Sequence, residues 1–279
     1  MRSFLAIISF QLVLFVATEV TGQISVSPTT LYIHDDINIG SLLVANGLDA
    51  EREISVSFDF GYPSSDSLGN LVMVYNDTLS EVRYGFGNRL RVFPRKFRLK
   101  PGSQQIVRVQ ILPMKSRPDG AFWTRMVIKS SEAKNLFDNN PAAGELSTHI
   151  NYIFKQNIAL FYLKGEVTTG LVPGEVNISV NDGKISVISE LKSSGNAPFN
   201  GCVSAKLFDN EGNMISSRQR TLVVYFEVLN RLEMVLPERD LSPGSYMLEF
   251  LYETKRSDIP AADLVQSEPV NYKFPFMIE

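Results

Sequence analysis

The chain has 279 residues, of which 44% are hydrophobic and 20% are charged, and its formal net charge is -3 with a pI near 5.6. This composition allows a sizeable buried core, and the length fits two domains of ordinary size better than one. The sequence has no basic excess or cluster, which argues against a nucleic-acid partner.

The first residues have the pattern of a secretory signal peptide. A basic start is followed by an apolar run, Phe4–Ala17, that only Ser9 and Gln11 interrupt, and then by small and polar residues. An apolar run of roughly 14 residues is shorter than the ~20 that a membrane span needs. We therefore expect residues 1–22 to form a cleaved signal peptide, with no membrane insertion after cleavage. An uncleaved anchor is the alternative.

Short segments of alternating apolar and polar residues follow, and this alternation is typical of half-buried strands. In the first half it predicts strands at 24–33, 40–45, 54–60, 71–75, 90–99, 106–111 and 122–128. Pro28 and Pro94 cannot donate a hydrogen bond to a neighbouring strand. Pro28 therefore indicates an edge strand, and Pro94 indicates a strand end or bend. Residues 61–69 and 130–144 are predicted to be loops because they are rich in turn residues.

The stretch 144–164 predicts the long strand around which the chain is organised. Its first part has alternate side chains that share one face: Leu146, Thr148, Ile150, Tyr152 and Phe154. Its second part is an unbroken apolar run, Ile158–Tyr162, of the kind found where both faces of a strand are covered. The strand should therefore be half-exposed at its start and buried at its end.

The second half is also rich in predicted strands. Segments 176–180 and 184–188 flank Asn181-Asp182-Gly183, which is a strong hairpin signal. Further strands are predicted at 203–208, 221–226, 232–236, 246–252 and 270–277, and no convincing helix of ordinary length is found. We predict an all-β protein with two immunoglobulin-like β-sandwich domains, at 23–165 and 166–279.

Catalytic and metal-binding motifs are missing from the sequence. It has no G-x-S-x-G, no H-E-x-x-H, no P-loop and no Cys/His cluster, and its two histidines, His34 and His149, are far apart. The single cysteine, Cys202, has no partner for an internal disulfide and is expected to be a small buried hydrophobe. We therefore predict no enzymatic activity, no cofactor and no metal site.

A resemblance to a known family arises from several motifs in residues 24–165. They are Val26-Ser27-Pro28-Thr29, Val92-Phe93-Pro94-Arg95, Leu99-Lys100-Pro101-Gly102-Ser103-Gln104, Val107-Arg108-Val109, Pro118-Asp119-Gly120 and Ile158–Tyr162. Together with the signal peptide, they resemble the PapD-like periplasmic chaperones of the chaperone-usher pilus pathway. The second half resembles that family only in its strand-rich pattern.

The resemblance implies a site. In that family the last strand of the first domain inserts apolar side chains into an incomplete pilin subunit, and this mode of binding is called donor-strand complementation. Alignment on Leu160-Phe161-Tyr162 assigns this role to Ile150, Tyr152 and Phe154. The alternative is that these three side chains face the core of their own domain.

The family commonly anchors the C-terminal carboxylate of the subunit with an Arg on the first strand and a Lys near the end of the last. The alignment places these positions at Thr30 and Ala159, and neither is basic. Lys155, four residues before Ala159 on the same face, is a candidate substitute. Its alternative is a solvated surface lysine.

Two functions from different classes follow. The first, implied by the resemblance, is a periplasmic chaperone that binds pilin-like subunits without ATP and delivers them for fimbrial assembly, with an outer-membrane usher as a second expected partner. The second is an exported structural or adhesive protein with two sandwiches and no chaperone activity.

Overall fold

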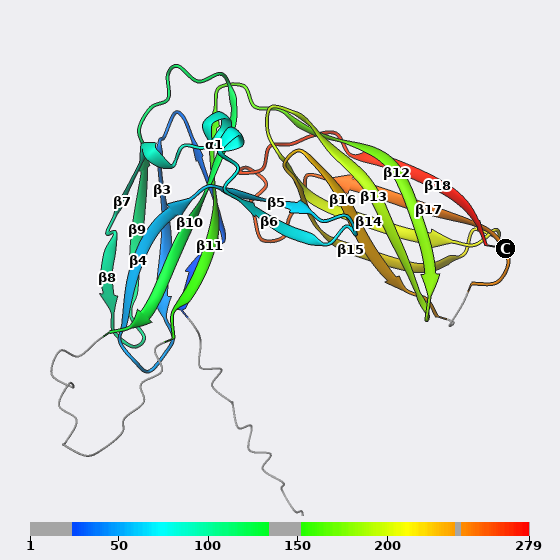
Figure 1. Cartoon of the computed structure of the whole chain (residues 1–279), viewed down its shortest axis with the longest axis horizontal. Helices are drawn as coiled ribbons and strands as arrows, with labels where there is room; N and C mark the ends of the chain where they lie inside the picture. The colour runs from blue at the N-terminus through cyan, green and yellow to red at the C-terminus, as the bar shows by residue number, and fades with distance from the viewer. Residues whose placement is uncertain (1–23, 134–151, 238–240, 279) are drawn as a thin grey trace, which may run out of the picture.

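The computed structural model describes residues 24–133, 152–237 and 241–278. Within them the chain is built almost entirely of strands, arranged as two β-sandwiches that meet at an angle (Figure 1). The predicted all-β class with two sandwiches is therefore confirmed. No helix in the described part of the chain is long and apolar enough to cross a membrane.

The first sandwich has one sheet of four strands and one of five. The four-stranded sheet has the order β1 (Ile24–Ser27), β3 (Ile39–Asn46), β9 (Gln104–Ile111), β7 (Leu90–Phe93). The five-stranded sheet has the order β2 (Thr30–His34), β11 (Phe154–Lys164), β10 (Gly120–Glu132), β4 (Arg52–Asp59), β8 (Lys96–Leu99). Alternate side chains of both sheets, such as Val107 and Val109 of β9 and Leu160 of β11, fill the core between them.

Both prolines interrupt strands in this sandwich. Residues 24–33, predicted as one edge strand, are two strands in different sheets, β1 and β2, which separate at Pro28. A proline lacks the N–H that a continuous ladder requires, so the chain changes sheets there. Pro94 lies between β7 and β8, and this confirms the predicted strand end.

The second sandwich packs a sheet of three strands on a sheet of four. The three-stranded sheet has the order β12 (Thr169–Asn181), β13 (Lys184–Gly195), β16 (Glu227–Val235). The four-stranded sheet has the order β15 (Met214–Val224), β14 (Phe199–Phe208), β17 (Gly244–Glu253), β18 (Val270–Ile278). Asp182 and Gly183 have φ of 49° and 73° in the turn between β12 and β13. Two consecutive positive φ values fit a type I′ turn, so the predicted hairpin is confirmed. Cys202 is buried and free, as expected.

A hairpin and a short helix extend from the first sandwich. The hairpin consists of β5 (Gly61–Ser65) and β6 (Leu71–Tyr75), and it is followed by α1 (Thr78–Tyr84) and the 3-10 turn η1 (Gly87–Arg89). The prediction of a loop over 61–69 was wrong for Gly61–Ser65. Pro63 and the serines of this segment are poor strand formers, but β6 supplies a partner strand that overrides their local preference.

The hairpin reaches across to the second sandwich (Figure 1). Its tip meets β16, where the Arg231 N–H donates to the Gly69 carbonyl at 3.3 Å and the Leu229 N–H donates to Ser65 Oγ at 2.8 Å. In its sheet, β16 pairs with β13 on one side. The hairpin bonds cover part of its other edge, with which no strand of that sheet pairs among the described residues. The hairpin therefore links the two sandwiches.

An aromatic cluster also joins the sandwiches. Its buried members come from both sides: Phe60, Tyr62, Trp123 and Phe161 from the first sandwich and Tyr225 from the second. The rings of Trp123 and Tyr225 lie 4.9 Å apart in an edge-on arrangement. Such pairs are favourable beyond the area that they bury. The angle between the sandwiches is therefore set by packed side chains as well as by the connecting chain.

Candidate partner-binding strand

The start of β11 has a free edge. On one side, β11 pairs with β2 in parallel, but only from Ala159 to Leu163, which lie opposite Thr30–His34. On its other side, β11 pairs with β10 along its whole length. In the described part of the chain, no strand pairs with the second edge of residues 154–158. An unpaired strand edge presents N–H and C=O groups that another strand can use.

Exposed apolar side chains lie at this free edge. Tyr152 is 63% exposed and Phe154 is 43% exposed, and Ile153 between them is exposed as well. Ile150, the third predicted donor residue, lies outside the described residues. The buried part of β11 begins at Ile158, so the buried end predicted for this strand is confirmed. The predicted strand began at residue 144; residues 144–151 lie outside the described residues, and the exposed Tyr152 and Ile153 precede β11.

Phe154 lies at the open end of the first sandwich. With Ile24, Ile128 and Ser130 it lines a small recess of about 80 Å³. Its ring also lies beneath the guanidinium of Arg52, whose Cζ is 5.7 Å from the ring centroid. Phe154 therefore contacts its own sandwich on one side while much of its surface remains exposed.

Arg52 holds the start of this strand, a role that sequence reasoning missed. Its side chain is buried, and it donates from Nε to Ser130 Oγ at 3.1 Å and from a terminal nitrogen to the Tyr152 carbonyl at 3.4 Å. These bonds join β4, β10 and the residues that precede β11. Because the partners are 78 and 100 residues away along the chain, no local pattern indicates the contact.

The two positions at which the family carries its basic anchor are adjacent. Thr30 and Ala159 are Cα partners in the parallel pair of β2 and β11. Lys155 is exposed and lies four residues earlier on β11, roughly 13 Å away at the rise of a strand. No hydrogen bond or ion pair of the Lys155 side chain is found with the other described residues.

A different cation lies beside Ala159. Arg125 of β10 is its Cα partner on the other side, and the Arg125 guanidinium donates to the Gly61 carbonyl at 3.1 Å and to the Tyr225 hydroxyl at 3.4 Å. No pattern in the sequence singles out Arg125, because the register that brings it next to Ala159 depends on the pairing of β10 with β11.

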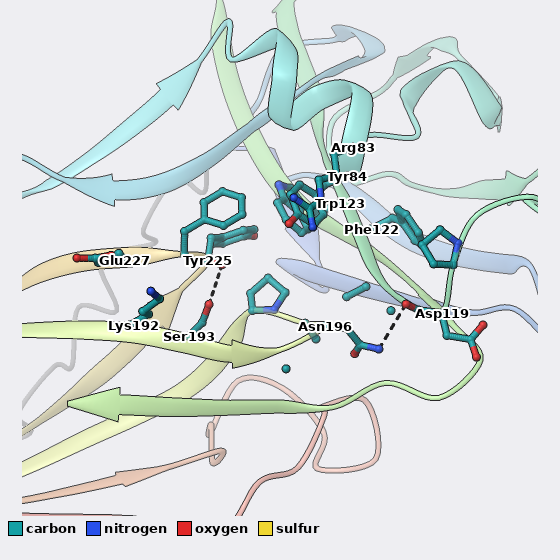
Figure 2. Close-up of a pocket in the computed structure, with 17 residues that line it drawn as sticks. Arg83, Tyr84, Asp119, Phe122, Trp123, Lys192, Ser193, Asn196, Tyr225 and Glu227 are labelled. Atoms are coloured by element: carbon teal, nitrogen blue, oxygen red, sulfur yellow. Dashed lines mark hydrogen bonds between the residues drawn. The ribbon is translucent and has the colours of Figure 1, made fainter. Parts of the chain in front are cut away.

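A cavity of about 390 Å³ opens between the two sandwiches (Figure 2). Aromatic side chains line it, among them Tyr84, Trp123 and Tyr225. One of its hydrogen bonds joins the two sandwiches: Asn196 Nδ2 donates to the Asp119 carbonyl at 3.4 Å. Another lies within the second sandwich, where Ser193 Oγ donates to the Tyr225 carbonyl at 2.9 Å. No histidine or cysteine is among the lining residues, so the cavity lacks a nucleophile–base pair of that kind.

Buried tyrosines make the fold sensitive to alkaline pH. Burial raises the pKa of Tyr225 from 10.0 to about 12, although Arg125 opposes the rise, and burial likewise raises the pKa of Tyr252 to about 12. Because the folded pKa lies above the unfolded one, the stabilisation is complete below pH 10 and is lost as the pH rises toward 12.

We therefore expect the free energy of unfolding to fall between pH 10 and pH 12, by about 2–3 kcal/mol for each of these two tyrosines. Urea denaturation from pH 8 to pH 12 measures the slope. Tyr225→Phe should reduce it, whereas the matched change at an exposed site, Tyr152→Phe, should leave it unaltered. An equal slope in all three proteins would contradict the assignment to Tyr225.

Comparison with known proteins places this architecture among solved structures. No protein-family model matches the sequence, and no curated protein matches it. The chain is similar in structure to the YadV chaperone, with 12% identity over 91% of this chain and 100% of that one and a TM-score of 0.44. It is also similar to the CupB2 chaperone of Pseudomonas aeruginosa, with 10% identity over 89% and 98% of the two chains and a TM-score of 0.45.

A third similar structure is that of the Salmonella enterica SafA pilin in complex with the SafB chaperone. The identity is 14% over 90% of this chain and 95% of that one, with a TM-score of 0.42. Each of these three structures thus contains a chaperone, and the third contains a pilin as well.

Proposed function

We propose that this protein is a periplasmic chaperone that binds incomplete fimbrial subunits and delivers them for assembly. The observation that supports the proposal best is the free edge of residues 154–158, together with the exposed apolar side chains of Tyr152 and Phe154. A subunit that lacks one strand has an open groove and an unpaired edge of its own. Addition of β11 to that subunit would satisfy the backbone groups of both partners.

The residues have separate roles in this proposal. Ile150, Tyr152 and Phe154 supply apolar side chains to the groove of the subunit. Lys155 is the candidate anchor for the subunit's C-terminal carboxylate, and Thr30 is the neutral residue at the family's first anchor position. The protein itself needs no ATP and catalyses no reaction, because the free energy of delivery comes from strand exchange.

The domain limits at 23–165 and 166–279 and the cleaved signal peptide are part of the same proposal.

Capture of a subunit tests the function directly. We expect the mature chain to form a one-to-one complex with a pilin-like subunit that lacks a strand, and the complex should be visible by co-expression and size-exclusion chromatography. The matched control is the same subunit with its missing strand supplied by fusion, which leaves no groove and should not bind.

Equal capture of both subunits would show that the contact does not involve the open groove. Failure to capture subunits encoded beside this gene would favour the second function, an exported structural or adhesive protein that keeps the two sandwiches but binds no pilin.

A further inference from the structure

Three arginines gather beside the tip of the β5–β6 hairpin. Arg218 and Arg220 of β15 and Arg231 of β16 line a recess of about 470 Å³ with the hairpin residues Gly69, Asn70 and Leu71. In Figure 1 the tip of this hairpin reaches toward β15 and β16. The recess therefore forms only because the hairpin of the first sandwich docks on the second.

The arginines have few anionic partners. Arg231 pairs with Glu233 at 2.9 Å, but its buried Nε has no hydrogen-bond partner among the described residues. Arg220 donates to the neutral side chain of Asn230. The side chain of Arg218 has no hydrogen bond or ion pair within the part of the chain that the structure describes.

The two arginines of β15 also act on each other. They are two residues apart on a regular strand, so their side chains leave the same face about 7 Å apart. Partial burial and then the charge of Arg218 lower the pKa of Arg220. Two like charges at this spacing repel each other, and an anion between them would relieve the repulsion.

Nearby carboxylates do not balance these charges. Glu233 also lines the recess, but its carboxylate is paired with Arg231. Asp66 of the hairpin accepts from the N–H groups of Leu68 and Asn70 and from the Asn70 side chain. These bonds, chiefly those of Asn70, and then the charge of Arg231 lower the pKa of Asp66, so its charge acts on Arg231 and on its own turn. Among the described residues, the guanidinium groups of Arg218 and Arg220 therefore remain without a carboxylate partner.

We propose that this recess binds a phosphate or sulfate group between Arg218 and Arg220, with Arg231 at its side. A guanidinium presents a planar fork of donors that matches the oxygens of such an anion, and charge-assisted bonds of this kind are among the strongest. Two unpaired positive charges match a dianion, which is the charge that a phosphate monoester approaches at neutral pH. This site is independent of β11 and of the chaperone function.

Titration of the mature protein with inorganic phosphate tests the site. We expect phosphate and sulfate to raise the melting temperature more than chloride does at equal ionic strength, because an anion bound only to the folded state stabilises it. Arg218→Gln should weaken phosphate binding by about tenfold or more in calorimetry, since it removes a charge-assisted contact. Arg218 is the best residue to change because its side chain has no hydrogen bond or ion pair with the other described residues.

The matched control is Arg91→Gln, which removes one exposed arginine from β7 in the first sandwich. Its phosphate affinity should equal that of the unchanged protein. Equal effects of phosphate and chloride, or equal affinities of the Arg218 and Arg91 variants, would overturn the proposal.

The same anion could be free in solution or part of a lipid headgroup. Flotation with vesicles that contain phosphatidic acid, compared with vesicles of phosphatidylcholine alone, distinguishes these sources. If the protein binds inorganic phosphate but neither vesicle, the source is a soluble phosphate. If it binds the acidic vesicles through Arg218 as well, the source is a headgroup.

Discussion

Replacement of Ile150, Tyr152 and Phe154 by serine is expected to weaken the binding of an incomplete subunit far more than it weakens the fold. Tyr152 is 63% exposed and Phe154 is 43% exposed, so much of their apolar surface is still available to a partner. Each side chain that becomes fully buried in the complex would contribute about 1.5–3 kcal/mol. The three changes together should therefore lower the affinity by roughly a thousandfold or more.

A matched variant separates this effect from a general loss of surface apolarity. Val172, Val235 and Met277 are exposed apolar residues of the second sandwich, and serine at all three should leave subunit binding unchanged. Calorimetry gives the affinities, and urea denaturation of the free proteins gives the stabilities.

The alternative is that the three residues pack in the core of their own sandwich. It predicts a large loss of stability in the free protein and little specific loss of subunit affinity. Truncation of a packed Phe or Ile costs about 2–5 kcal/mol of stability. A β11 variant that unfolds easily and still binds subunits at normal affinity would therefore rule out the donor-strand role. A variant that folds normally and binds normally would rule it out as well.

Trp123→Ala should cost about 3–5 kcal/mol of unfolding free energy, because it removes the largest side chain from the cluster that joins the sandwiches. The Trp123 side chain is 2% exposed, and its ring stacks on that of Tyr84 at 4.5 Å while the Phe226 ring lies 5.8 Å away. The cavity left by this change would therefore remove packing contacts of both sandwiches.

Trp123→Phe is the informative companion change. The indole Nε1 of Trp123 is buried and has no hydrogen-bond partner among the described residues, so phenylalanine loses packing but no bond. We expect its cost to be well below that of alanine. Phe93→Ala, at a site that is 76% exposed, is the control and should change stability little.

Urea denaturation followed by tryptophan fluorescence suits the unchanged protein, because Trp123 is its only tryptophan. Circular dichroism is needed for the variants. A cost below about 1 kcal/mol for Trp123→Ala would show that the cluster does not stabilise the joint between the sandwiches.

Local pattern was sufficient for most strands of this protein. Apolar and polar residues alternate with a period of two in a half-buried strand, and this period can be recognised in the sequence without knowledge of any tertiary contact. It located β9 and β17, and the turn signal Asn181-Asp182-Gly183 located the hairpin of β12 and β13, because positive φ is easiest for such residues. The unbroken apolar run Ile158–Tyr162 likewise indicated the buried end of β11.

The sequence by itself therefore determined the all-β class, the two sandwiches and the buried end of β11. Tertiary structure alone decided that β2 stops short of residues 154–158, that Arg52 holds Tyr152, that β5 and β6 form a hairpin, and that Arg218, Arg220 and Arg231 share one recess. Each of these features joins residues far apart in the chain. Strand pairing between distant segments sets the register, and a local period carries no information about which segments will pair.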